Sequence, residues 1–167
     1  MTEQPLSTAP DSAPQIRALG TPVIVDVFAR TTDDDKVGFT HAWKWGEKGP
    51  NEGNGPINIP ERRPNGPETP MHFHLRDQTD DPKRGLVFAD NQGSAMWVKR
   101  DACPPDRPRC DDGQIPPAEM VRELKVLKVV NINSEKCTLH YRLWFKDRDG
   151  EWESYDPEII NGGKGQA

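Results

Sequence analysis

The 167-residue chain contains no apolar run that approaches the roughly 20 residues needed to cross a bilayer. Only 33% of its residues are hydrophobic. Glycine (14) and proline (17) together make up 31 of the 167 residues, well above their average combined usage of about 12%. The chain is therefore rich in residues that interrupt regular structure. Its length nevertheless allows one domain with a core of its own. We therefore expect a single domain with a modest core and long loops.

Clustered basic residues are also missing. The net charge is −5, and Arg62-Arg63 and Lys83-Arg84 are isolated pairs. Because nucleic-acid phosphates are bound by clustered positive charge, we expect no nucleic-acid partner. Residues 1–14 lack the basic start and apolar middle of a secretory signal. These features predict a cytoplasmic protein with no membrane partner.

Cysteine is scarce, and its spacing does not suit zinc. Neither Cys-x-x-Cys nor His-x3-His occurs among the three cysteines and four histidines. Cys103 and Cys110 bracket a proline-rich loop, which would close as a disulfide in an oxidising compartment and stay reduced in the cytosol. The sequence leaves both states open. Cys137 lies on an apolar strand face and is expected to act as a small buried hydrophobe.

Recognisable catalytic motifs are absent. There is no Gly-x-Ser-x-Gly and no phosphate-binding loop, and Cys137 and His140 fall on opposite faces of one strand. The acidic runs Asp33-Asp34-Asp35 and Asp80-Asp81 lack the spaced ligands of a calcium loop. We interpret both runs as solvated turns, and we expect a protein that is not an enzyme and carries no cofactor.

The segments that are present predict strands. Short alternating segments separated by turn residues are typical of an all-β, antiparallel β-sandwich of the immunoglobulin-like kind. We expect a flexible N-terminal arm over residues 1–20, one sandwich domain over 21–160 and a tail over 161–167. The last strand should end at Asp156-Pro157. The expected strands cover residues 21–29, 37–45, 71–77, 85–89, 94–99, 124–132, 137–145 and 151–155.

The clearest strand runs from Cys137 to Phe145, because its apolar residues alternate without interruption. One face should line the core with Cys137, Leu139, Tyr141, Leu143 and Phe145.

Two regions are less regular. The proline- and glycine-rich stretch 46–70 reads as a long loop, in which Ile57 and Ile59 can form a short edge strand. Residues 115–125 suit either a helix that begins near Pro117 or a strand, and we choose the strand.

One spacing suggests a metal site. The pattern Gly66-x5-His72-x-His74-x3-Gln78-x6-Gly85 resembles the first motif of the cupins, small β-barrels that often hold a transition metal. The resemblance implies one transition metal ion bound by His72, His74 and Gln78, although glutamine stands where that family has glutamate and the second cupin motif is missing. The alternative is two surface histidines on the polar face of a strand.

A second resemblance concerns the end of the chain. The segments Val129–Asn133, Cys137–Tyr141 and Tyr155–Ile159 are similar to the closing strands of small bacterial immunoglobulin-like sandwiches, in particular the bacterial inclusion-body protein family. This resemblance implies a fold and no activity.

Tryptophan provides the remaining signal. Trp144 alternates with His140 and Arg142 on the polar face of the clearest strand. Tryptophan and arginine are common anchors of protein interfaces, and tryptophan also stacks on sugars. Our leading hypothesis is therefore a non-enzymatic sandwich that acts through protein–protein contacts, with a partner or with itself. The alternatives are a cupin-like metal protein that uses His72 and His74, and a carbohydrate-binding module.

Overall fold

The computed structural model describes residues 19–80, 84–89, 95–100, 113–116 and 120–165. The secondary-structure elements whose bounds are described are all strands. Their bounds are β1 (Val23–Thr31), β2 (Val37–Trp45), β3 (Asn51–Gly53), β4 (Ile57–Ile59), β5 (Thr69–Asp77), β6 (Val87–Phe88), β7 (Met96–Arg100), β8 (Val121–Arg122), β9 (Val126–Asn131), β10 (Lys136–Lys146), β11 (Trp152–Tyr155) and β12 (Glu158–Gly162).

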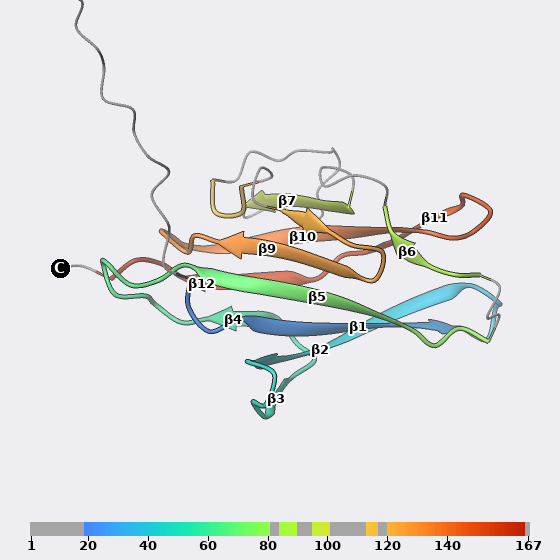
Figure 1. The fold of residues 1–167 in the computed structure, drawn as a ribbon, viewed down its shortest axis with the longest axis horizontal. Helices are drawn as coiled ribbons and strands as arrows, with labels where there is room; N and C mark the ends of the chain where they lie inside the picture. Colours follow the sequence, from blue (N-terminus) through green and yellow to red (C-terminus); the bar gives the residue numbers. More distant parts are fainter. Residues whose placement is uncertain (1–18, 81–83, 90–94, 101–112, 117–119, 166–167) are drawn as a thin grey trace, which may run out of the picture.

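The strands form two sheets that pack face to face (Figure 1). The first sheet has the order β3-β2-β1-β5-β9-β8. The second sheet has the order β11-β10-β12-β4, and β6 and β7 pair with β10 on its other edge. The predicted all-β sandwich is therefore confirmed, and the immunoglobulin-like topology stays a prediction.

The sheets are mixed, which corrects the expectation of purely antiparallel pairing. β1 pairs with β5 in parallel, as does β12 with β4, whereas the other pairings between strands are antiparallel. A parallel neighbour requires a crossover rather than a hairpin turn. The proline-rich stretch between β2 and β5 supplies that crossover, because it places β4 in the second sheet before the chain returns to the first. Ile57 and Ile59 of β4 are buried, as the predicted edge strand requires.

The core lies between the sheets, and β10 is the central strand of the second one. Leu139, Tyr141, Leu143 and Phe145 are all fully buried, which confirms the predicted register of this strand. Cys137 is only half-buried, because it lies near the start of β10 at the margin of the core. The first sheet contributes alternate side chains of β1 and β5, namely Val23, Val25, Val27, Met71, Phe73 and Leu75.

The chain does not end its last strand at Asp156-Pro157. β12 follows this dipeptide and pairs with the start of β10, so the predicted tail from Asn161 is wrong over residues 161 and 162. Proline removes one amide donor but keeps its carbonyl, and the Pro157 carbonyl accepts a hydrogen bond from the Tyr141 amide at 3.1 Å. The dipeptide therefore separates β11 from β12, and the chain continues to pair with β10 beyond it.

Other expectations fall partly outside the described residues. These are most of the arm (1–18), the loop that holds Cys103 and Cys110, and residues 117–119 of the ambiguous segment. The described part of that segment contains β8, and Leu19 forms a parallel bridge with Glu68.

Buried amide side chains join the two sheets at one end of the sandwich. Asn131 of β9 and Asn161 of β12 are fully buried and exchange two hydrogen bonds, at 2.7 and 3.1 Å. Asn133 donates to the Pro60 carbonyl at 2.9 Å and accepts from the Gly163 amide at 2.8 Å. Each buried amide thus has partners, which is the condition for burying polar groups without a large cost.

Candidate functional site

The outer face of the second sheet carries the predicted interaction residues. His140, Arg142 and Trp144 alternate with the core residues of β10, so they point away from the first sheet. Pairing of β7 with β10 places Trp97 opposite Arg142, and pairing of β11 places Trp152 opposite Lys146. The sheet therefore gathers three tryptophans from three strands. We call Trp97, Trp144, Trp152 and Arg142 the tryptophan face.

The side chains of the tryptophan face contact one another. The ring centroids of Trp97 and Trp144 lie 4.9 Å apart, and those of Trp144 and Trp152 lie 5.8 Å apart. The Arg142 guanidinium lies 5.6 Å from the Trp144 centroid, within the range of a cation–π contact. Trp152 is 49% exposed, so this face presents a large aromatic side chain to solvent.

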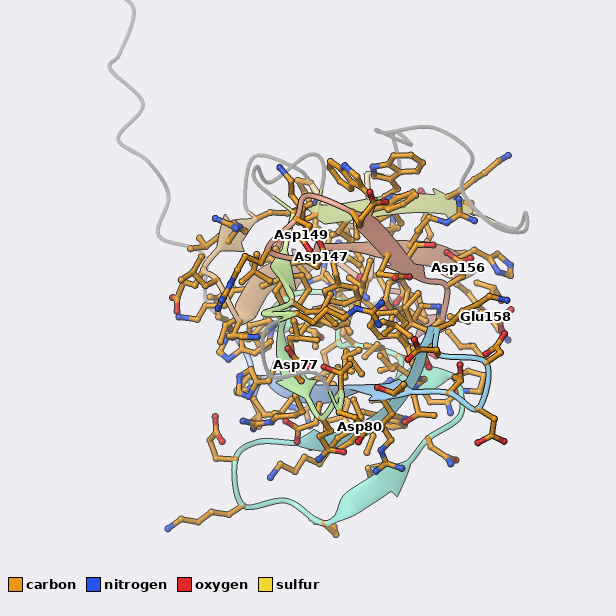
Figure 2. The ribbon with its side chains drawn as sticks, turned by 90° about the vertical axis from the view of Figure 1, so that its right-hand side faces the viewer. Asp77, Asp80, Asp147, Asp149, Asp156 and Glu158 are labelled. Atoms are coloured by element: carbon orange, nitrogen blue, oxygen red, sulfur yellow. The ribbon has the colours of Figure 1, made fainter. Side chains whose placement is uncertain are left out.

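Charged groups border the tryptophan face. Arg142 donates two hydrogen bonds to the Asp156 carboxylate, the second at 3.0 Å, and His140 lies 3.2 Å from Glu158. Figure 2 labels both of these acidic residues, Asp156 and Glu158. The border therefore carries charged groups of both signs, and ion pairs within the chain hold these groups in position.

Two indole N–H groups on this face have no acceptor in the part of the chain that the structure describes. They belong to Trp97 and Trp144, and both nitrogens are buried. A buried donor without an acceptor costs about 1–3 kcal/mol. Such a cost at two adjacent side chains sets this face apart from the Asn131–Asn161 region, where every amide has a partner.

The sequence located only half of the tryptophan face. Trp144, Arg142 and His140 come from one strand, so strict alternation was enough to place them together. Trp97 and Trp152 join them only because β7 and β11 pair with β10. Alternation within a single strand does not reveal which strands pair. The signal that was present is the outward position of each tryptophan in its own alternating strand.

The histidines of the cupin-like pattern lie on the outer face of the first sheet. His72 and His74 alternate on β5 with the buried Met71, Phe73 and Leu75, and their ring centroids are 6.5 Å apart. The imidazoles therefore point away from the second sheet, not between the sheets as they would inside a barrel.

The other groups around this histidine pair differ from the predicted ligand set. Gln78 accepts a hydrogen bond from Arg30 at 3.0 Å. The neighbour of His74 is Asp26 of β1, 3.8 Å away, and Asp26 in turn accepts from Arg76 at 2.7 Å. Sequence reasoning missed Asp26 because it lies on a different strand. Burial, together with the positive charge of Lys128 and the neighbouring His74, lowers the pKa of His72.

Among the described residues, no group of three His, Cys, Asp or Glu side chains is arranged to hold a metal ion. The metal site on His72, His74 and Gln78 stays a prediction.

No family model matches the sequence, and no curated protein matches it either. In the described part of the chain, no helix has the length and apolarity needed to span a membrane.

Several acidic side chains lie at one end of the sandwich. Figure 2 looks at this end, with Asp147 and Asp149 labelled together in the upper half and Asp77 and Asp80 below them. The Asp147 carboxylate accepts hydrogen bonds from the amides of Asp149 and Glu151, both at 2.9 Å, and Asp77 accepts from the Leu86 amide at 3.1 Å. These hydrogen bonds stabilise turns of the chain. The positions of Asp77 and Asp147 therefore need no bound ligand to account for them.

One buried histidine links β2 of the first sheet to β11 of the second. His41 of β2 is 6% exposed; its Nε2 lies 2.8 Å from the Gly55 carbonyl and its Nδ1 lies 2.6 Å from the Tyr155 hydroxyl. A carbonyl only accepts, so Nε2 carries the proton and Nδ1 accepts from Tyr155. Burial lowers the pKa of His41, although the hydrogen bond to Gly55 acts in the opposite direction. The fold therefore holds His41 neutral.

We expect the protein to lose stability as the pH falls from 7 to 5, partly because of His41. Its pKa in the folded state is lower than the value near 6.5 in the unfolded chain, so the unfolded chain binds more protons in this range. The contribution is complete above the unfolded pKa and is lost as the pH falls towards the lower folded pKa. Urea denaturation at pH 7 and pH 5 measures the difference.

The His41→Phe variant cannot titrate at this position, so its stability should change less between the two pH values than that of the wild type. His72→Ala is the matched comparison, because it removes the other histidine whose pKa is lowered and leaves His41 in place. An equal pH dependence in the wild type and His41→Phe would contradict the assignment.

Proposed function

We propose that this protein acts through protein–protein contacts, and that it associates with further copies of itself through the tryptophan face. The observation that carries the proposal is the exposed Trp152 beside the contacting pair Trp144 and Arg142. Tryptophan and arginine dominate the residues whose loss costs most at protein interfaces. We retain the immunoglobulin-like topology as part of this proposal.

A second copy is the partner that the charges favour. The border of the tryptophan face carries Arg142 and Lys146 together with Asp156 and Glu158. A surface that carries both signs can oppose itself across a twofold axis in an arrangement where positive groups of one copy face negative groups of the other. Ile160 of β12 is 39% exposed on the same outer face and extends the apolar part of the contact.

The geometry gives less support to the carbohydrate alternative. Sugar stacking uses a flat aromatic surface that is open to solvent. The planes of Trp97 and Trp144 are inclined by 54°, and those of Trp144 and Trp152 by 80°. Rings inclined in this way pack edge against face with each other, so they offer no common plane.

The test compares Trp152→Glu with the wild type by sedimentation velocity over a range of protein concentrations. The wild type should form dimers or larger species as concentration rises. Loss of an anchor residue costs about 2 kcal/mol or more, so Trp152→Glu should associate roughly 30-fold more weakly or not at all. Trp152 is half exposed in the single chain, so the variant should keep its fold, which circular dichroism checks.

Val121→Glu is the matched control. Val121 is 50% exposed, like Trp152, but it lies on β8 of the first sheet. It should associate as the wild type does. A wild type that stays monomeric at high concentration, or equal weakening by both substitutions, would contradict the proposed contact.

A further inference from the structure

A hollow of about 520 Å³ opens at the end of the sandwich where β2 and β4 end and β5 begins. Figure 1 has this end of the sandwich at the left. Its wall includes the apolar side chains of Trp45, Ile59, Pro60 and Pro67 together with four charged residues, Glu61, Arg62, Arg63 and Glu68. Volumes of about 300–1,000 Å³ with apolar walls are typical of binding sites. This hollow lies away from the tryptophan face, which is on the outer side of the second sheet.

The lining also includes two residues whose polar groups have unused hydrogen-bonding capacity. Among the described residues, neither the indole N–H of the half-buried Trp45 nor the guanidinium of the exposed Arg63 has a hydrogen-bond or ion-pair partner. Arg62 differs, since it donates to the Gly66 carbonyl at 2.7 Å and to the Asn133 carbonyl at 3.3 Å. One arginine therefore holds the rim together, and its neighbour is available to a ligand.

The described part of the chain begins beside this hollow. Gly20 and Thr21 are part of the lining, and the Gly20 amide donates to the Glu68 carbonyl at 2.8 Å. Residues 1–18 precede this point and can span up to roughly 60 Å when extended. Their sequence carries three prolines, Pro5, Pro10 and Pro14, and two acidic residues, Glu3 and Asp11.

We propose that the hollow binds the proline-rich N-terminal segment, residues 1–18, of a second copy of this chain. Proline-rich segments are recognised by aromatic-lined grooves, where the proline rings pack on indole and the indole N–H donates to a backbone carbonyl. Trp45, Pro60 and Pro67 supply such a surface. Arg63 supplies a positive charge for Glu3 or Asp11.

The segment of a second copy suits the hollow better than the chain's own segment. Gly20 and Thr21 line the hollow and the Gly20 amide is bound to the Glu68 carbonyl, so the chain's own first described residues are held at the rim and the space inside is left for another segment. Two copies related by a twofold axis can instead exchange segments, each filling the other's hollow, which gives a closed and reciprocal contact. The inference rests on the proposed self-association and adds to it a second contact on a different surface.

The first measurement is fluorescence anisotropy of a labelled peptide of residues 1–18 titrated with the full chain. The peptide should bind saturably, and a peptide with the same residues in scrambled order should not. Trp45→Phe keeps an aromatic ring, although a smaller one, and loses the N–H donor, and Arg63→Glu reverses the charge. Each should weaken binding about tenfold or more. Circular dichroism of both variants verifies the fold. Absence of binding, or equal binding to the wild type and both variants, would overturn the inference.

The second measurement separates a neighbouring copy from the same chain. A photo-crosslinking residue at position 10 should join two full chains, and mass spectrometry should locate the link at the hollow. Links found only within one chain would overturn the assignment to a second copy. Trp152→Glu should leave peptide binding unchanged, whereas Trp45→Phe should leave the tryptophan-face contact intact. Failure of one contact is therefore distinguishable from failure of the other.

Discussion

Replacing Leu143 by alanine should lower the free energy of unfolding by about 2–5 kcal/mol. Leu143 is fully buried at the middle of the second sheet. Strand pairing fixes the backbone on both sides, with Met96 of β7 opposite on one edge and Tyr155 of β11 opposite on the other. Neighbours held in this way cannot move in to fill the lost volume, so most of the cavity should remain. Urea denaturation followed by circular dichroism measures the loss.

Tyr141→Phe is the matched control on the same face of β10. The Tyr141 side chain is fully buried, yet its hydroxyl has no hydrogen-bond partner in the described part of the chain. Removing an unpaired buried hydroxyl while keeping the ring should be neutral or should stabilise the fold by about 1 kcal/mol. A loss below about 1 kcal/mol for Leu143→Ala would instead mean that this face of β10 does not line the core.

The register of β10 was predictable because burial of one face imposes a period of two. Leu139, Tyr141, Leu143 and Phe145 occupy alternate positions without interruption, so a slip by one residue would expose all four. β2 is similar, since Phe39, His41, Trp43 and Trp45 lie on one side as alternation predicts. Local periodicity thus determined which face of these strands is buried.

Strand partners were less predictable, because they depend on where the chain goes between strands. β1 has its antiparallel hairpin partner β2 on one side. Nothing in the alternation of Val23–Val27 indicates that β5 lies in parallel on the other side. β12 was missed for a different reason: Asp156-Pro157 is a common strand end, but here the Pro157 carbonyl still joins the ladder. In the residues that follow, Glu158–Gly162, the two hydrophobic side chains are adjacent in sequence, so hydrophobic and polar residues do not alternate.

The candidate sites follow the same division. His140, Arg142 and Trp144 share one strand and were placed together by the sequence, whereas Trp97 and Trp152 reach them only through pairing. The lining of the hollow is more remote still, since Trp45 and Pro67 come from segments separated by the crossover. A site assembled from several strands depends on topology, which local patterns do not determine.

Replacing Asn133 by alanine should lower the free energy of unfolding by about 2–4 kcal/mol, because it leaves two backbone groups without partners. The Pro60 carbonyl would lose its donor and the Gly163 amide would lose its acceptor. Asn133 is fully buried and has a φ of 48°, a left-handed conformation that disfavours alanine more than asparagine. Thermal and urea denaturation measure the loss.

Two further substitutions at this position distinguish the cost of a positive φ in alanine from the cost of losing the two hydrogen bonds. Asn133→Gly removes both hydrogen bonds but accepts the positive φ, so it should be less destabilising than alanine. Asn133→Asp keeps an oxygen acceptor for the Gly163 amide and loses the donor to Pro60, while it places a charge among buried groups. The aspartate variant should therefore recover stability as the pH is lowered and the carboxylate is protonated, whereas the alanine and glycine variants should not. If all three variants matched the wild type, Asn133 would not hold the loop after β4 to the end of β12, and the lining of the neighbouring hollow would need another support.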